Sequence, residues 1–389
     1  MPLVYVSLIV SALLIIHIIA GYPLLLAVRP RARRPRVVKD PAFETTVSVI
    51  LAVHNGEAMI RNKLETLLGL DYPRRLMDII VVSDGSTDRT EAIVREFGNR
   101  GVNLVIAPRG GKAAALNYGL AAAAGEILFF TDVRQPLEPM SLRHMVSNFA
   151  DNTVGAVTGE LHLLKGDTGE QADMDLYWRY EIWARTRHSE IDSLFNTTGC
   201  IYTMRRALAG PLPPDTLTDD AILPLRAFFK GYRVIFDPSA IAFDYPAVAG
   251  TEFRRRFRTL AGLWQVHARL PELFTGRNRM RFHFLSHKFG RLVLPWLILA
   301  FFISAAALPG SWFRASLLIA GFIWLLLAAG NALVSPASPL KRATSPARTF
   351  LVMNAAALAS VAVFFVPATR LWRPTRVQPA GDAAQSSNR

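Results

Sequence analysis

The chain has 389 residues, of which 51% are apolar and 19% are charged, and its formal net charge is +14. Four uncharged apolar runs are each long enough to cross a bilayer, which takes about 20 residues, so a soluble protein is excluded. Nucleic acid is excluded as a partner, because no recognised motif and no interleaved aromatics accompany the basic residues. Cys200 is the only cysteine, which excludes an intramolecular disulfide. The apolar runs are residues 3–28, 292–313, 315–340 and 349–369.

The basic residues predict how these runs are oriented. Six Lys or Arg follow the first run between residues 29 and 39, and residues 1–16 carry no charged side chain. Basic flanks lie on the cytoplasmic side, so the N-terminus is expected outside and the region after residue 29 in the cytoplasm. Four full spans would leave the tail outside despite its Arg370, Arg373 and Arg376, and a re-entrant fourth run is the alternative. Anionic membrane lipids are expected partners of the basic residues.

After the first run, apolar stretches rich in Val and Ile alternate with amphipathic stretches. Strand and helix in alternation predict an α/β fold with a mostly parallel sheet, helices on both faces, and ligands at the carboxyl ends of the strands. The predicted strands are residues 47–53, 79–83, 104–107 and 127–131, and the predicted helices between them are residues 57–70, 87–97 and 112–124.

Polar residues collect directly after the predicted strands. The pair Gly110-Gly111 would let backbone N–H groups approach an anion, and the following lysine adds positive charge. Each turn alone also has a structural explanation, but four of them at one sheet edge favour a ligand site. Because dinucleotide and P-loop motifs are missing, a nucleotide diphosphate carrying a transferable group suits this edge. The candidate residues are His54, Glu57, Asp84, Lys112, Asp132 and Arg134.

Two adjacent carboxylates, Asp219 and Asp220, precede a predicted helix at residues 221–230. Thr218 or Asp219 can cap this helix, and the positive end of its dipole keeps carboxylates ionised. An ionised carboxylate at a helix start can act as a general base on a sugar hydroxyl. A purely capping role is the structural alternative.

Together these motifs resemble the membrane-bound inverting family-2 glycosyltransferases over about residues 45–265. Residues 47–57 are similar to the family's opening strand and turn, and residues 83–88 (SDGSTD) to its Asp-Asp-Gly-Ser-x-Asp. Residues 111–117 (GKAAALN) are similar to its Gly-Lys-x-x-x-Leu-Asn, and Thr131-Asp132 to the start of its metal-binding Asp-x-Asp. Residues 199–206, beginning at Gly199, resemble its strand near the acceptor.

The resemblance implies a GT-A type fold and a role for each site residue. His54, Glu57 and Asp84 would lie on the nucleotide side, Lys112 near the diphosphate, and Asp132 on Mg²⁺ or Mn²⁺. The expected donor is a nucleotide sugar, a UDP-sugar first. In the family, the catalytic Asp is followed six residues later by Arg and then by Gly-Tyr-Arg. Arg226 and residues 231–233 fix that frame, so Asp220 takes the catalytic position and Asp219 replaces the preceding Glu.

The sequence departs from the family pattern at two places. Arg134 stands where the second Asp of Asp-x-Asp is expected, so it could neutralise the diphosphate directly and weaken the metal dependence. Alternatively, Arg134 pairs with a nearby acid such as Glu138. Polymer-making members carry Gln-Arg-x-Arg-Trp after the base. Here Arg256 and Arg258 match this motif, and the resemblance places them on the acceptor or diphosphate side. Residues 255 and 259 are Arg and Thr instead of Gln and Trp, which puts long-chain processivity in doubt.

Two segments before the second apolar run read as interfacial helices. Phe253, Phe257, Leu260 and Trp264 recur at helical spacing opposite several arginines, and residues 281–288 form another such segment. His283 and His287 are expected to be interfacial residues and not metal ligands, since no Glu accompanies them.

These observations predict six segments. They are an anchor (1–28), a basic linker (29–45), a cytoplasmic glycosyltransferase domain (46–245), interfacial helices (246–290), three membrane segments (291–371) and a disordered tail (372–389). The predicted function is inverting glycosyl transfer to a lipid-linked or oligosaccharide acceptor at the cytoplasmic face of the inner membrane, in extracellular polysaccharide or glycan synthesis. The alternatives are addition of one sugar to polyprenyl phosphate and a non-catalytic sugar-nucleotide-binding assembly subunit.

Overall fold

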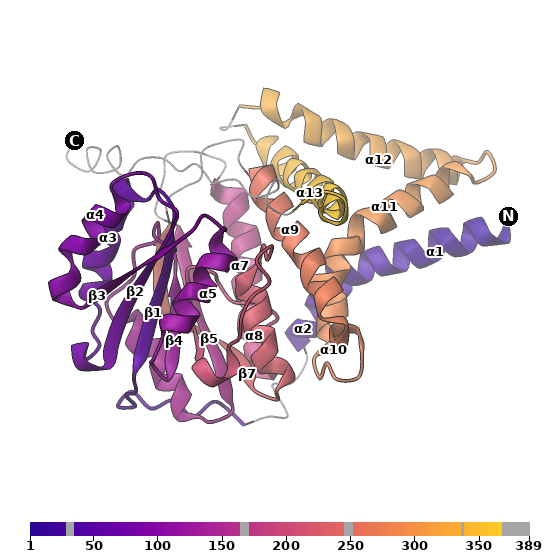
Figure 1. Ribbon diagram of the computed structural model, residues 1–389. Helices are drawn as coiled ribbons and strands as arrows, with labels where there is room; N and C mark the ends of the chain where they lie inside the picture. The colour runs from indigo at the N-terminus through magenta and orange to yellow at the C-terminus, as the bar shows by residue number, and fades with distance from the viewer. Residues whose placement is uncertain (29–34, 164–170, 245–251, 336–337, 368–389) are drawn as a thin grey trace.

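The computed structural model describes residues 1–28, 35–163, 171–244, 252–335 and 338–367. Most of the predicted basic linker's arginines and the whole predicted tail therefore lie outside the described residues. A sheet domain with helices packed on it lies at one side of the molecule, and a group of long helices that includes the N-terminal one extends from the other side (Figure 1).

The sheet has seven strands in the order β3-β2-β1-β4-β6-β5-β7. Strands β3, β2, β1 and β4 are mutually parallel, β6 is antiparallel to β4 and β5, and β5 and β7 are parallel. The predicted mostly parallel sheet is confirmed, and the four strands with predicted bounds, β1 to β4, lie within two residues of those bounds. The strands are β1 (Val47–Val53), β2 (Met77–Asp84), β3 (Val102–Ala107), β4 (Ile127–Thr131), β5 (Val154–Leu163), β6 (Ile201–Arg205) and β7 (Arg233–Asp244).

Helices cover both faces of the sheet, as predicted. Side chains of β1 alternate between two apolar cores, with Val49 and Leu51 in one and Ile50 in the other. Since both faces are covered, the parallel strands read as continuous apolar runs in the sequence. Helices α3 (Glu57–Leu68), α4 (Thr90–Glu96) and α6 (Ser141–Val146) contribute to the first core, and α5 (Lys112–Ala122) and α8 (Asp219–Phe229) to the second.

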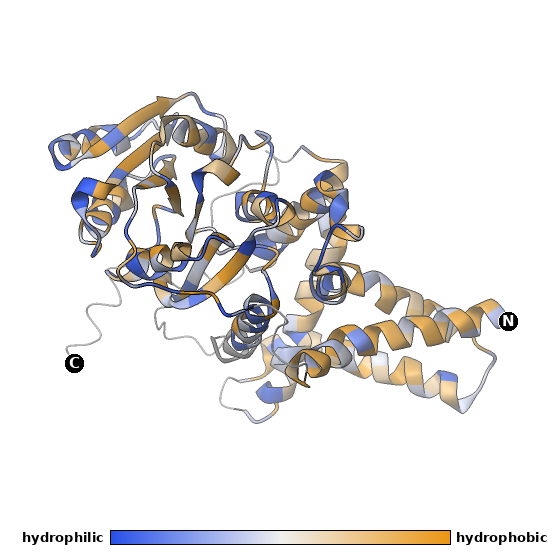
Figure 2. Cartoon of the chain, turned by 90° about the horizontal axis from the view of Figure 1, so that it is seen from below, coloured by the Kyte–Doolittle hydropathy of each residue, from blue (hydrophilic) through white to orange (hydrophobic). Residues whose placement is uncertain are grey.

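Four helices are long and apolar enough to cross a membrane, over Pro2–Val28, Arg281–Ala306, Trp312–Leu333 and Lys341–Phe364. They comprise α1 (Pro2–Ile16), α2 (Tyr22–Val28), α10 (Arg281–His283), α11 (Gly290–Ala306), α12 (Trp312–Gly330) and α13 (Lys341–Ala359), with π-helical stretches joining α1 to α2 and α10 to α11. Most of their residues are hydrophobic (Figure 2).

The second of these helices begins eleven residues earlier than the apolar run at residue 292. The sequence places a separate interfacial segment at residues 281–288, but the structure makes it part of the same helix. Two charges of this helix face the protein: Lys288 and Arg291 each lie 2.8 Å from a carboxylate oxygen of Glu181 on α7 (Gln171–Ile191). An exposed charged side chain is costly inside a membrane, whereas a charge that is paired within the protein is tolerated there.

Helix α9 (Glu252–Arg269) packs against protein over its second half. Trp264 Nε1 donates to Ser360 Oγ at 3.1 Å, and Val266 is buried in the core beside α8. The apolar stripe expected at a membrane interface therefore continues into contacts with α13 and the sheet domain.

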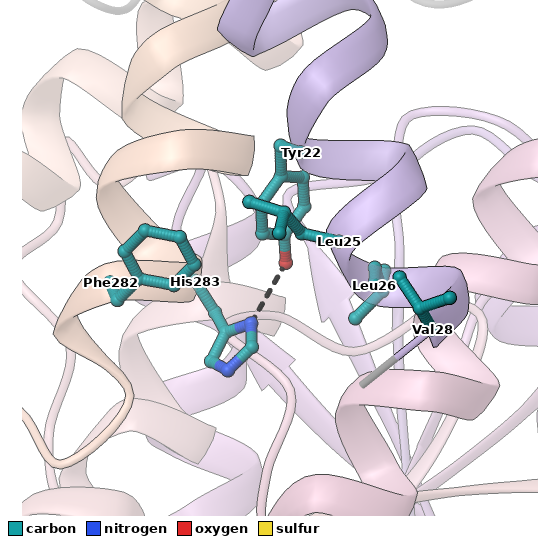
Figure 3. A pocket seen from close by; sticks show the side chains of 6 residues that line it. All are labelled: Tyr22, Leu25, Leu26, Val28, Phe282 and His283. Atoms are coloured by element: carbon teal, nitrogen blue, oxygen red, sulfur yellow. Dashed lines mark hydrogen bonds between the residues drawn. The ribbon is translucent and has the colours of Figure 1, made fainter. Parts of the chain in front are cut away.

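A buried polar cluster joins the first apolar helix to the sheet domain. Tyr22 Oη contacts His188 Nε2 at 2.6 Å and His283 Nδ1 at 3.0 Å. Burial lowers the pKa of His188 to about 3, so its ring is neutral at physiological pH. His283 and His287, expected at the interface, are buried in this cluster instead. Beside it lies a cavity of about 340 Å³ with Leu25, Leu26, Val28 and Phe282 in its walls (Figure 3).

Candidate active site

The polar residues that follow β1, β2 and β4 lie at one edge of the sheet, because these strands are parallel and in register. Lys112, the first residue of α5, lies at the centre of this edge. Its Nζ is 2.9 Å from Asp132 Oδ1 and 3.3 Å from Asp219 Oδ1. Gly111 has a φ of +87°, which favours glycine and turns the chain into α5. Burial lowers the pKa of Lys112, but the two carboxylates outweigh burial and raise it overall, so Lys112 stays charged.

Helix α8 begins at Asp219, two residues before the predicted start, with Thr218 as its N-cap residue. The Thr218 side chain makes no capping hydrogen bond. Asp219 and Asp220 occupy the first turn, at the positive end of the helix dipole. Asp219 is buried and accepts from Tyr202 Oη at 3.2 Å in addition to pairing with Lys112. Asp219 is therefore held on both sides.

Asp220 differs from its neighbour because its backbone, and not its carboxylate, is held. Thr197 donates to the Asp220 carbonyl oxygen from its N–H at 2.8 Å and from Oγ1 at 2.9 Å. Within the part of the chain that the structure describes, the Asp220 carboxylate accepts no hydrogen bond, and its side chain is partly exposed. A Cβ at Gly199 would lie 3.5 Å from Asp220 Oδ2, so a larger residue there would crowd this carboxylate.

Its surroundings make Asp220 more basic than an ordinary aspartate. Burial of the group, followed by the like charge of Asp219, raises its pKa from 3.8 to about 7, although Lys112 and Arg185 oppose this shift. A carboxylate with a pKa near the working pH is suited to accept a proton in a reaction.

On the nucleotide side, Asp84 is buried and its carboxylate is fully engaged. It accepts from Gly110 N at 2.7 Å and from Gly111 N at 3.0 Å, and it pairs with Arg109. The backbone N–H groups that the sequence offered to an anionic ligand are therefore directed at Asp84 itself. His54 Nδ1 lies 2.9 Å from the Asp84 carbonyl oxygen. A contact of Asp84 with a nucleotide base stays a prediction.

Glu57 links two loops at the same edge. Its Oε2 accepts from Arg89 N at 3.0 Å, and its own N–H donates to Asp88 Oδ2 at 3.0 Å. These bonds tie the start of α3 to the loop before α4. The structure thus gives Glu57 a structural task, and its expected role toward the nucleotide sugar stays a prediction.

The loop after β4 places Asp132 and Arg134 in different surroundings. Asp132 keeps 37% of its side chain exposed beside Lys112. Arg134 forms a bidentate ion pair with Asp244, the last residue of β7, at 2.9 and 2.7 Å. The sequence suggested Glu138 as a partner for Arg134, but Glu138 accepts from Met140 N at 2.8 Å. The sequence interpretation missed Asp244, although an acid directly after an apolar strand is the signal that had flagged Asp84 and Asp132.

Lys63 of α3 is a second residue that the sequence did not single out. It is 2% exposed, and its Nζ donates to Thr131 Oγ1 at 2.7 Å and to the Gln135 carbonyl oxygen at 2.5 Å. Burial lowers its pKa to about 7. Lys63 thereby fixes both ends of the loop that carries Asp132 and Arg134.

The two arginines predicted on the acceptor or diphosphate side lie on α9 and are partly buried. Burial lowers the pKa of Arg258, and the carboxylates of Asp132 and Asp220 act against this shift. The guanidinium of Arg258 is therefore within electrostatic reach of both carboxylates. Arg256 lies on the same helix, and its role stays a prediction.

Residues 48–210 match the sequence family described as Glycosyl transferase family 2. Over this part of its sheet domain, the chain is similar to family 2 glycosyltransferases. Among its relatives, the probable glycosyltransferase YdaM of Bacillus subtilis (strain 168) is 28% identical over 257 residues, which cover 61% of this chain and 60% of that protein. The poly-beta-1,6-N-acetyl-D-glucosamine synthase of Staphylococcus epidermidis is 25% identical over 228 residues, or 57% and 55% of the two chains. The chain thus matches less than two thirds of the length of these glycosyltransferases.

A solved glycosyltransferase resembles the whole described architecture. The mannosyltransferase PcManGT from Pyrobaculum calidifontis, solved in complex with GDP-Man and Mn²⁺, has a TM-score of 0.69 and 26% sequence identity. The similarity covers 92% of this chain and 99% of that one. The predicted GT-A type fold is confirmed by this comparison.

The edge of the sheet that carries Asp132 fits a divalent metal through one carboxylate. No group of three or more His, Cys, Asp or Glu that could hold a metal occurs among the described residues. Asp132 is partly exposed at the sheet edge, and Mg²⁺ and similar ions are commonly held by one or two carboxylates together with substrate phosphates and waters. The donor set therefore suits an ion that arrives with a nucleotide diphosphate.

Proposed function

We propose that this protein transfers a glycosyl group from a nucleotide sugar to an acceptor hydroxyl with inversion of the anomeric carbon. The observation that carries the proposal is the contrast between the two adjacent aspartates. Asp219 is buried and held by Lys112 and Tyr202, whereas the Asp220 carboxylate is partly exposed and has a pKa of about 7. In such a pair, Asp219 stays bound to its partners, and Asp220 is the carboxylate that can accept a proton.

In the proposed reaction, Asp220 takes the proton of the acceptor hydroxyl. The acceptor oxygen forms a bond to the anomeric carbon as the bond between that carbon and the nucleotide diphosphate breaks. The bonding electrons leave with the diphosphate, and the proton stays on Asp220 until solvent removes it. General-base assistance of this kind contributes about 10²–10⁴-fold to the rate.

In this proposal, the residues around Asp132 bind the diphosphate of the nucleotide sugar. Lys112 is the charged group nearest this carboxylate, at 2.9 Å. Asp132 would hold Mg²⁺ or Mn²⁺, and such an ion offsets the negative charge of a leaving diphosphate when it is bound. The Mn²⁺ in the Pyrobaculum calidifontis mannosyltransferase structure supports divalent metal use.

We propose a UDP-sugar as the donor and a lipid-linked or oligosaccharide acceptor at the cytoplasmic membrane face, in polysaccharide or glycan synthesis. The Staphylococcus epidermidis relative, by its name a poly-beta-1,6-N-acetyl-D-glucosamine synthase, supports this assignment. GDP-mannose is the second donor to test, because the solved neighbour contains it. Arg255 and Thr259, which replace the family's Gln and Trp, speak against long-chain processivity, and transfer of a single sugar to polyprenyl phosphate is the alternative.

The test is a transfer assay on membranes that contain the full-length protein, with labelled UDP-, GDP- and dTDP-sugars and analysis of the product's anomeric configuration. Asp220→Asn should abolish transfer and leave nucleotide binding nearly intact. Asp215→Asn is the matched control, since Asp215 lies five residues earlier, is exposed, and pairs with Arg269 at 2.6 Å. Nucleotide binding without transfer by the wild type, for every donor and a mixed lipid and oligosaccharide acceptor pool, would favour the non-catalytic assembly subunit.

A further inference from the structure

Asp244 takes no part in the reaction proposed above, yet it forms the most specific contact of the Asp132 loop. Arg134 Nε donates to Asp244 Oδ1 at 2.9 Å, and Arg134 Nη2 donates to Oδ2 at 2.7 Å. Gln135 Nε2 donates to the same Oδ2 at 3.1 Å. Asp244 is 2% exposed. A planar guanidinium bound in this bidentate way is fixed in one orientation.

The pair leaves most of the Arg134 guanidinium available. A guanidinium has five N–H donors, and Asp244 accepts from two of them. The other donors find no acceptor among the residues that the structure describes, and 23% of the Arg134 side chain is exposed. A fixed fork with free N–H groups at the edge that carries Asp132 suits the oxygens of a diphosphate.

The pair also removes most of the charge that Arg134 would bring. A carboxylate at 2.7 Å neutralises the guanidinium as seen from a few ångströms away. Lys112 is balanced in the same way by Asp132 and Asp219. Both cations in the loops next to Asp132 therefore offer hydrogen bonds but little uncompensated charge to a nucleotide diphosphate.

We propose that Asp244 is a positioning residue that orients Arg134, cancels its charge, and thereby keeps nucleotide-sugar binding dependent on a divalent cation. This inference rests on the proposed function and specifies how the charges of its nucleotide-sugar site are balanced. It differs from the sequence-based expectation that Arg134 weakens the metal dependence. The difference arises because the cancelling carboxylate comes from β7, 110 residues further along the chain.

The experiment measures binding of UDP and GDP to the full-length protein in detergent by titration calorimetry, once with Mn²⁺ and once with EDTA. The ratio of the two dissociation constants is the metal gain. Asp244→Asn should release the charge of Arg134, so binding in EDTA tightens about tenfold and the metal gain shrinks by a similar factor. Arg134→Gln should do the opposite, because the site then loses the guanidinium that offsets the charge of Asp244. The double variant Arg134→Gln/Asp244→Asn should restore a metal gain near that of the wild type.

Asp237→Asn is the matched control, since Asp237 lies on the same strand, is buried, and accepts from Lys39 and Asn148. Its metal gain should equal that of the wild type. A folded Asp244→Asn protein with an unchanged metal gain would overturn the role of Asp244. If that variant does not fold, an Arg134→Gln metal gain no larger than that of the wild type overturns it. A wild type that binds neither nucleotide refutes the proposed function, and the role of Asp244 falls with it.

Discussion

The raised pKa of Asp220 makes Asp220→Asn a substitution that should cost activity and add stability. The carboxyl pKa rises from an ordinary 3.8 to about 7 in the folded protein, so the folded state holds the proton more tightly than the unfolded chain. Ionisation of Asp220 therefore destabilises the fold as the pH rises from about 4 to about 7. With 1.36 kcal/mol for each pH unit, the cost is about 4 kcal/mol at pH 8 and about 1.5 kcal/mol at pH 5.

Asparagine keeps the size of the side chain and removes the charge. The variant should melt roughly 10 °C above the wild type at pH 8, and the difference should shrink at pH 5, if about 1 kcal/mol corresponds to 2–4 °C. In the same preparations, wild-type kcat/KM should fall about tenfold for each pH unit below 7, because the base must be ionised. Asp220→Asn should lose about 10²–10⁴-fold of the activity together with this pH dependence.

Asp219→Asn separates the two aspartates. It removes the like charge that helps raise the pKa of Asp220, so the midpoint of the pH profile should move below 7. It also removes the negative charge that pairs with Lys112 and weakens the hydrogen bond from Tyr202, so its melting temperature should fall at pH 8, where that of Asp220→Asn rises. A lower melting temperature for Asp220→Asn at pH 8, or a larger loss of activity in Asp219→Asn, would refute the assignment of Asp220 as the base.

Three further predictions concern the rest of the chain. Tyr22→Phe should destabilise the protein by about 1–3 kcal/mol because it leaves buried histidine nitrogens without their partner, whereas Tyr5→Phe, on an exposed residue, should have no effect on the melting temperature. Arg279→Met should lower the free energy of unfolding in chemical denaturation more than Arg277→Met, because it removes the guanidinium that pairs with the buried Asp192 carboxylate. Arg277 pairs with Glu272 at an exposed site, and its substitution should cost at most about 1 kcal/mol. A reporter after residue 100 should be active in the cytoplasm and one at the C-terminus outside. A cytoplasmic C-terminus would make the fourth apolar helix re-entrant.

The strands were predictable because they are buried on both sides. Val47–Val53 and Ile127–Thr131 agree to the residue with the expected bounds, since an apolar β-branched run between turn residues leaves little freedom. Helix starts were less certain. The start of α8 was expected at residue 221, because Asp219 and Asp220 read as residues before a helix, whereas the structure has them in its first turn. Capping preferences alone do not distinguish these neighbouring positions.

The candidate site was predictable where single loops carry it, and not where distant segments meet. Lys112 and Asp132 come together because β3 and β4 are parallel strands that end at the same edge of the sheet. The pairing of Arg134 with Asp244 depends on where the end of β7 lies relative to β4, and no local pattern contains that information. Lys63 was passed over for a similar reason, since a lysine in an amphipathic helix is expected at the surface and this one is buried under the Asp132 loop.

Glu181 has a practical consequence for anyone who wants the enzymatic part in water. Its carboxylate is buried in the sheet domain, but the cations beside it, Lys288 and Arg291, belong to the second apolar helix. Trimming the protein to the sheet domain would leave that negative charge stranded and would remove the hydroxyl of Tyr22 from His188. The sheet domain thus takes part of its charge balance from the apolar helices, so the two parts should be purified together, in detergent or a lipid disc.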